Sequence, residues 1–147
     1  MIRRLHPIAG GVALALILGF WTSTLAAELY GDPAMVARVK TLILWGMLVL
    51  VPAMATVGAT GFRMGAHATE PLIVAKRRRM PLIALNGLLV LLPSAVLLQA
   101  RAASGDFDTV FWSLQALELG AGALNISLMS LSVRDGLRLA ARRRAAA

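Results

Sequence analysis

Four long apolar segments dominate the chain, and together they leave little room for a soluble fold. Each holds about 20 mostly apolar residues, the length that an α-helix needs to cross about 30 Å of hydrocarbon. Of the 147 residues, 59% are hydrophobic and 15% are charged, an apolar excess that a soluble core of this size does not bury. We therefore expect an all-α, integral membrane four-helix bundle that forms one domain over residues 1–147. The expected spans are approximately residues 7–27, 40–62, 81–100 and 109–133.

Basic residues predict the orientation of these spans. Twelve of the 15 Lys and Arg residues precede the first span, follow the fourth, or lie between the second and third. The other side of the membrane receives only Arg38, Lys40 and Arg101. The positive-inside rule then predicts a multi-pass protein of a bacterial cytoplasmic (inner) membrane with both termini in the cytoplasm. Because the basic clusters flank spans and contain no interleaved aromatic residues, we expect membrane lipids, and not nucleic acid, as their partners.

The two halves of the chain show a weak internal similarity. A gapless shift of 74 residues gives twelve identities in 73 positions, including Pro7 with Pro81 and Gly31-Asp32 with Gly105-Asp106. One interpretation is a 2+2 repeat about an axis along the membrane normal, in which each proline opens a helix. The other is chance matching among helices rich in Leu, Ala and Gly.

Prolines also interrupt two spans near their middles. Pro52 and Pro93 each follow a similar apolar run that begins with glycine. A proline inside a membrane helix leaves one carbonyl without its usual donor and bends the helix. We expect kinked helices, with a hinge for transport as the alternative.

The fourth span carries a polar face. Gln115, Glu118, Gly122, Asn125 and Met129 follow one another at spacings of three and four, so they share one side of a helix. Glu118 falls near mid-membrane, where an ionisable residue is costly and faces the protein interior or a cavity. Since no basic residue is expected at its depth, we predict a neutral acid.

Three interpretations of this face remain open. In the first, it is an intramembrane polar seam in which Gln115, Glu118 and Asn125 hydrogen-bond to Asn86 of the third span or to hydroxyl groups of the first. In the second, Glu118 fixes an interface with a second copy or with other membrane subunits. In the third, Glu118 belongs to a proton relay or a substrate site.

The two histidines are expected at the same side of the membrane, with His6 before the first span and His67 after the second. Two imidazoles at one level of a bundle predict a candidate haem b site, in which His6 and His67 ligate the iron from opposite faces. A Cu(I) site formed by Met64 and His67 with Met80 or Met129 is an alternative. Solvated interfacial histidines without a metal are the third possibility.

The opening run Arg4-Leu5-His6-Pro7-Ile8-Ala9 resembles the start of the first helix in four-span bacterial proteins of the copper-resistance-D and membrane protoporphyrinogen-oxidase type. This resemblance implies a haem or metal ligand at His6 and extends only to these residues and the four-span plan. In this chain His6 is expected just outside the helix. The chain as a whole is similar to uncharacterised four-span bacterial inner-membrane proteins, which implies no activity.

The sequence constrains the function of the protein less than its architecture. Cysteine is absent, which excludes disulfides, thiol nucleophiles and Cys-ligated metals. The chain has no phosphate loop, zinc-protease helix or nucleophile elbow. We therefore expect a non-enzymatic accessory or structural subunit of a membrane complex. The alternatives are a haem-binding electron-transfer protein that uses His6 and His67, and a small transporter or proton-relay protein that uses Glu118.

Overall fold

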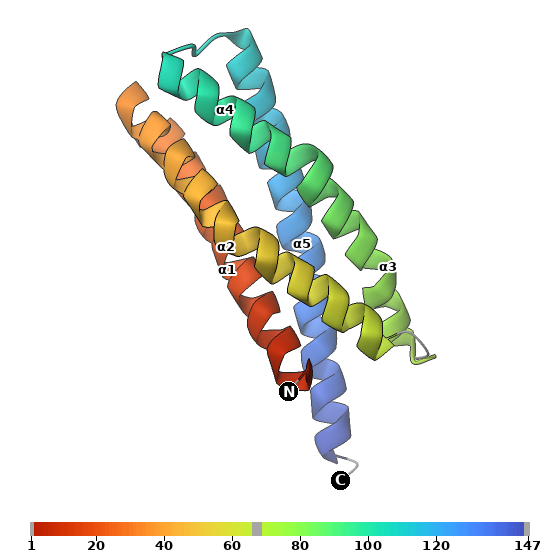
Figure 1. Cartoon of the computed structure of the whole chain (residues 1–147). Helices are drawn as coiled ribbons and strands as arrows, with labels where there is room; N and C mark the ends of the chain where they lie inside the picture. The colour runs from red at the N-terminus through yellow and green to blue at the C-terminus, as the bar shows by residue number, and fades with distance from the viewer. Residues whose placement is uncertain (1, 66–68, 146–147) are drawn as a thin grey trace.

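The computed structural model describes residues 2–65 and 69–145, and it confirms the predicted all-α four-helix bundle (Figure 1). Three elements, α3, η1 and α4, follow one another without a break and form one rod. The bounds are α1 Ile2–Tyr30, α2 Pro33–Gly65, α3 Pro71–Asn86, η1 Gly87–Leu91, α4 Leu92–Ser104 and α5 Thr109–Ala145. The four rods are each long and apolar enough to cross a membrane.

The helices lie side by side with both chain ends at one end of the bundle, which we call the terminal end (Figure 1). The opposite end, the hairpin end, contains the α1–α2 and α4–α5 connections. Helix α5 contacts α1, α3, η1 and α4, and α1 packs along α2. Large apolar side chains such as Leu42, Trp45 and Leu48 remain exposed on the outer face of α2, as expected for side chains that meet lipid.

The two connections at the hairpin end differ in detail. Between α1 and α2, Asp32 Oδ1 accepts a hydrogen bond from the backbone N–H of Met35 at 2.7 Å. Between α4 and α5, Gly105 adopts φ +77°, the left-handed conformation that ends many helices. There the backbone N–H of Phe111, followed by the Arg101 guanidinium, holds the pKa of Asp108 below its usual value. Among the described glycines only Gly105 has a positive φ, so Gly31 does not repeat this turn.

Prolines do not open helices where the sequence predicted. Pro7 and Pro81 both lie inside helices, and Pro71 takes the first turn of α3 instead. Helices were expected to start at the edges of the apolar runs. Each of the first three rods instead begins several residues before its apolar run. A proline removes only one backbone donor, and a packed helix continues past it.

Two apolar clusters hold the rods together. One lies between the middle of the bundle and the terminal end, and the other lies at the hairpin end. The first consists of Ala13, Ile17, Leu50, Ile83 and Met129, and the second of Ala27, Val36, Leu98, Ala102 and Phe111. Between them, Gly46 meets the Phe20 ring and Gly122 meets the Trp21 ring so closely that a Cβ atom would lie within 3 Å of either ring. Glycine at these positions therefore lets two aromatic side chains of α1 insert between the helices.

Candidate functional site

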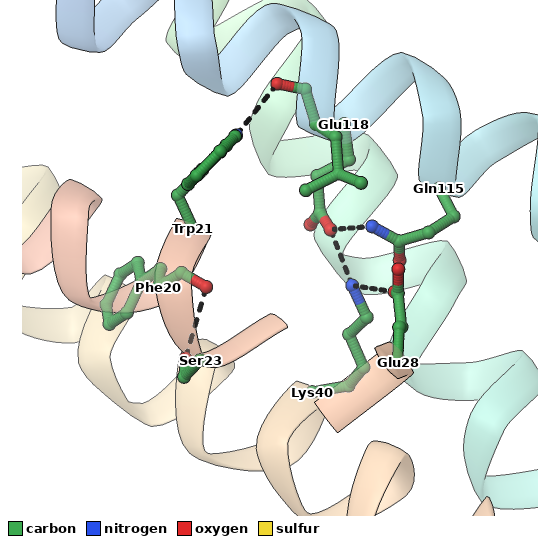
Figure 2. A network of polar contacts seen from close by, with 8 residues as sticks. Phe20, Trp21, Ser23, Glu28, Lys40, Gln115 and Glu118 are labelled. Atoms are coloured by element: carbon green, nitrogen blue, oxygen red, sulfur yellow. Dashed lines mark hydrogen bonds and ion pairs between the residues drawn. The ribbon is translucent and has the colours of Figure 1, made fainter. Parts of the chain in front are cut away.

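Three helices contribute to a buried ion-pair network in the half of the bundle nearer the hairpin end. Lys40 of α2 places its Nζ 2.5 Å from Glu118 Oε2 of α5 and 3.9 Å from Glu28 Oε1 of α1 (Figure 2). Gln115 Nε2 donates to the same Glu118 Oε2 at 3.3 Å. We call Glu28, Lys40, Gln115 and Glu118 the polar cluster. Only 1% of the Lys40 side chain is exposed, so this network lies inside the bundle.

Helical periodicity explains how Lys40 enters the bundle. It lies four residues after Val36 and three before Ile43, and both neighbours are buried. The three side chains share the inward face of α2. The four methylene groups of Lys40 continue that apolar face and carry its ammonium group to the carboxylates.

The expectation that Glu118 lacks a basic neighbour is wrong, which removes the reason for predicting a neutral acid. Helix α2 begins at Pro33, seven residues before Lys40, whereas Lys40 was expected at the membrane edge. Two further titratable groups, Lys40 and Glu28, therefore lie beside Glu118, and the close Lys40 contact is an ion pair.

Two buried oxygen atoms of the polar cluster have no hydrogen-bond partner among the described residues. They are Glu28 Oε1 and Gln115 Oε1. Figure 2 shows the Glu28 carboxyl group and the Gln115 amide pointing toward one another. Both atoms are acceptors in their usual forms, so each lacks a donor among the described residues.

A mostly apolar cavity of about 280 Å³ lies beside the polar cluster. It is lined by residues of α1, α2, α5 and the α3–η1–α4 rod, with Glu118 and Thr24 toward the hairpin end and Asn125 farther along α5. In the described part of the chain, α2 and η1 both line the cavity, and their backbones do not approach each other closely. Lining residues on these two elements, Val51 and Leu88, are 40% and 53% exposed, so the cavity opens between α2 and η1 at the level of the hydrocarbon.

Glu118 presents one carboxylate oxygen for this cavity. Its Oε2 atom is engaged by Lys40 and Gln115. No described residue hydrogen-bonds to Oε1, and this atom is not among the fully buried ones. Since Glu118 lines the cavity, Oε1 is a hydrogen-bond acceptor at the edge of an apolar space.

Trp21 forms a wall of the cavity next to this carboxylate. Its Nε1 donates to the carbonyl oxygen of Leu119 at 3.0 Å, as Figure 2 shows. Its ring lies against Gly122. The hydrogen bond to Leu119 holds the ring against α5. It also occupies the only hydrogen-bond donor of the indole. Trp21 thus presents an apolar face to the cavity and no polar group.

The other predicted members of the polar seam meet one turn or more away. Asn86 Nδ2 donates to Asn125 Oδ1 at 2.9 Å and to the Ala121 carbonyl oxygen at 2.8 Å. Asn125 Nδ2 in turn donates to the Ile83 carbonyl oxygen at 3.4 Å. The structure therefore brings Asn86 and Asn125 together, whereas Glu118 and Gln115 belong to the separate polar cluster.

The rod opposite α2 changes its helical pitch where it borders the cavity. In η1 the chain forms π-helical hydrogen bonds, and the N–H of Leu92 donates to the carbonyl oxygen of Gly87. Pro93 follows and has no N–H to donate. Pro52, by contrast, lies within a continuous α2. A single π turn widens a helix locally and is frequent at functional sites.

His6 lies inside α1 and is buried, contrary to the expectation that it precedes the helix. Its Nδ1 is 2.9 Å from Thr60 Oγ1, and Lys76 Nζ is 3.1 Å from its Nε2. Thr60 already donates its hydroxyl hydrogen to the Thr56 carbonyl oxygen. Hence Nδ1–H donates to Thr60, and Nε2 accepts from the Lys76 ammonium group.

This environment does not fit haem ligation by His6. Both ring nitrogens are engaged, and the Lys76 cation lies in the direction that an iron ligand would use. The second predicted ligand, His67, lies outside the described residues. Within residues 2–65 and 69–145 no three His, Asp or Glu side chains form a group suited to a metal ion.

The methionines proposed for Cu(I) have separate surroundings. Met129 packs in the apolar core with Ile17 and Leu50. Met80 lies against Gly61 beside the His6 ring, and Met64 is 42% exposed. Met129 therefore serves the core, and the copper interpretation remains a prediction that depends on His67.

A second ion-pair group, not foreseen from the sequence, joins α3 to α5 near the terminal end. Asp135 is buried and accepts a hydrogen bond from Arg79 Nη1 at 2.6 Å. Arg134 lies 3.4 Å away and is half exposed. The Lys76 ammonium group also interacts electrostatically with Asp135. Asp135 follows Ser132 and Met129 at helical spacings of three, and this continuation of the inward face of α5 could have identified it.

Comparison of the chain with protein-family models, curated proteins and solved structures found no match.

Proposed function

We propose that this integral membrane protein binds, from the bilayer, an apolar molecule that carries one hydrogen-bond donor, and that it does so without catalysis. The observation that carries the proposal is the position of Glu118, whose Oε1 has no partner among the described residues and borders an apolar cavity. A carboxylate oxygen in such a place favours a donor group on the ligand.

The shape of the cavity supports a ligand taken from lipid. Its opening lies between α2 and η1, where the surrounding exposed side chains are apolar. Its volume of about 280 Å³ is near the lower end of small-molecule sites, which suits one ring or a short chain segment. The remainder of a longer ligand would stay in the hydrocarbon.

Binding is testable with a photoreactive long-chain alcohol added to the protein in lipid nanodiscs. We expect labelling on α2 around Val51 and on η1, and about tenfold weaker binding of the matched methyl ether, because the ether cannot donate to Glu118. A Gly58→Leu variant should lower labelling by about tenfold or more. Gly58 lines the cavity, and a side chain there points into open space.

The matched control is Gly19→Leu. Gly19 also has open space beside it, but it is exposed on α1 outside the cavity. We expect this variant to be labelled like the wild type. Equal labelling of the Gly58→Leu and Gly19→Leu variants, or equal binding of alcohol and ether, would contradict the proposal.

A second candidate function is the accessory subunit expected from the sequence. It is favoured by the outer face of α5, where Ser113, Ala116 and Gly120 are exposed and would let another membrane helix approach closely. Because the chain has no cysteine, a Gly120→Cys variant reports on this face alone. A specific disulfide cross-link to a copy or a co-purifying subunit would support this role, and a monomer in every mild detergent would count against it.

The proposed location is a bacterial cytoplasmic membrane with the terminal end in the cytoplasm, in keeping with the distribution of basic residues. In that orientation the polar cluster lies in the half of the membrane that faces away from the cytoplasm.

A further inference from the structure

The polar cluster contains more acceptors and more negative charge than its hydrogen atoms satisfy. The charged groups that face Glu28 are Lys40 from α2 and Glu118 from α5. Two carboxylates and one ammonium group leave one uncompensated negative charge if all are ionised. A buried, uncompensated charge is strongly unfavourable in a membrane-embedded bundle.

The unsatisfied atoms show where a compensating proton would fit. Glu28 Oε1 is 3.9 Å from Lys40 Nζ, which is beyond hydrogen-bond distance. Gln115 Oε1 has no donor among the residues described. Its amide is oriented so that Nε2 donates to Glu118, and exchanging Oε1 with Nε2 would lose that bond.

We propose that the polar cluster is a proton-binding site: Glu28 holds a proton at neutral pH and donates it to Gln115 Oε1, while Lys40 and Glu118 remain an ion pair. One proton supplies the missing hydrogen and removes the excess charge. This inference goes beyond ligand binding, because it concerns the protonation of the polar cluster and requires no molecule in the cavity.

The contacts assign the proton to Glu28 and the negative charge to Glu118. Glu118 Oε2 receives hydrogen bonds from both Lys40 and Gln115, and such bonds favour the carboxylate. Glu28 receives no hydrogen bond of comparable length from a described residue. The proton is therefore held by Glu28, whose carboxyl group is farther from the Lys40 ammonium group than that of Glu118.

Infrared difference spectroscopy of the protein in lipid bilayers tests this assignment. We expect the wild-type spectrum at neutral pH to contain the C=O band of a protonated carboxylic acid, which shifts in D₂O and disappears in Glu28→Gln. The Glu28→Gln variant keeps a donor for Gln115, so it should melt like the wild type. The matched control Glu70→Gln changes an exposed carboxylate at the terminal end and should retain the band.

A Gln115→Leu variant tests the hydrogen bond itself. Removing its acceptor should leave the protonated acid in place and move the C=O band to higher frequency. Should the variants fail to fold, the wild-type protein labelled with ¹³C in its glutamate carboxyl groups gives the same information, since it contains only Glu28, Glu70 and Glu118. One resonance of the three should have the shift of a neutral acid at neutral pH.

Absence of a protonated-acid band from the wild-type spectrum would overturn the proposal and would point to a bound water as the missing donor. A band that disappears in Glu118→Gln but persists in Glu28→Gln would overturn it as well. Neither result depends on whether the cavity binds a ligand.

Discussion

Replacing Lys40 by methionine is expected to lower the free energy of unfolding by about 3–5 kcal/mol, the usual cost of removing one partner from a buried ion pair. Methionine keeps much of the apolar length of lysine but no charge. Glu118 would lose its 2.5 Å partner and remain buried beside Glu28. The measurement is unfolding in mixed micelles with increasing denaturing detergent, followed by fluorescence of the three tryptophans.

Two controls separate the charge pair from a general effect on α2. Arg38→Met removes a cation from an exposed position on the same helix and should change stability by no more than about 0.5 kcal/mol. The double variant Lys40→Met with Glu118→Leu should recover most of the loss, because neither charge then remains unpaired. If Lys40→Met and Arg38→Met were equally stable, the ion pair would not hold the helices together.

Replacing Asp135 by asparagine is expected to lower the free energy of unfolding by about 2–4 kcal/mol. Asparagine has nearly the same shape but cannot neutralise Arg79, which donates to Asp135 at 2.6 Å, or balance the nearby Lys76. The expected loss is smaller than for Lys40 because the Arg79 side chain is 21% exposed and water partly screens it. The same detergent unfolding assay measures it.

Glu70→Gln is the matched control for Asp135→Asn, since it also converts a carboxylate to an amide in an ion pair with arginine. The Glu70–Arg142 pair is exposed, with an N–O distance of 3.6 Å, and should contribute no more than about 1 kcal/mol. Similar losses in the two variants would mean that burial of Asp135 does not strengthen its contacts.

Much of the fold follows from patterns within single helices. Apolar length predicts four spans, and the spacing of Gln115, Glu118 and Asn125 predicts that they face inward. Counting residues from each membrane edge also places Asn86 near Asn125, which the structure shows hydrogen-bonded. These predictions work because helical rise and periodicity are nearly constant.

The partners of Glu118 could not be obtained in the same way. Counting apolar residues ends a span at its first charged side chain, which put Lys40 at the membrane edge and not inside the bundle. Glu28 lies just beyond the expected first span, residues 7–27, for the same reason. Whether a charged residue near a helix end points inward depends on how the helix is rotated against its neighbours, and a single sequence does not specify that rotation.

The histidines illustrate a second limit. Their shared side of the membrane suggested one site, but the side chains of Thr60 and Lys76 determine what His6 can bind. Both residues come from other helices, so only tertiary packing reveals that the imidazole is already engaged.

The contact between Lys40 and Glu118 can be measured directly by solid-state NMR in lipid bilayers. The chain has two lysines and three glutamates, so ¹⁵Nζ-lysine and ¹³C-carboxyl-glutamate labels give few resonances. We expect a strong dipolar coupling between Lys40 Nζ and the Glu118 carboxyl carbon, corresponding to the 2.5 Å N–O contact, and its loss in Glu118→Gln. A Lys40 resonance with no coupling to any glutamate carboxyl carbon would contradict the buried polar cluster on which the proposed binding and proton sites depend.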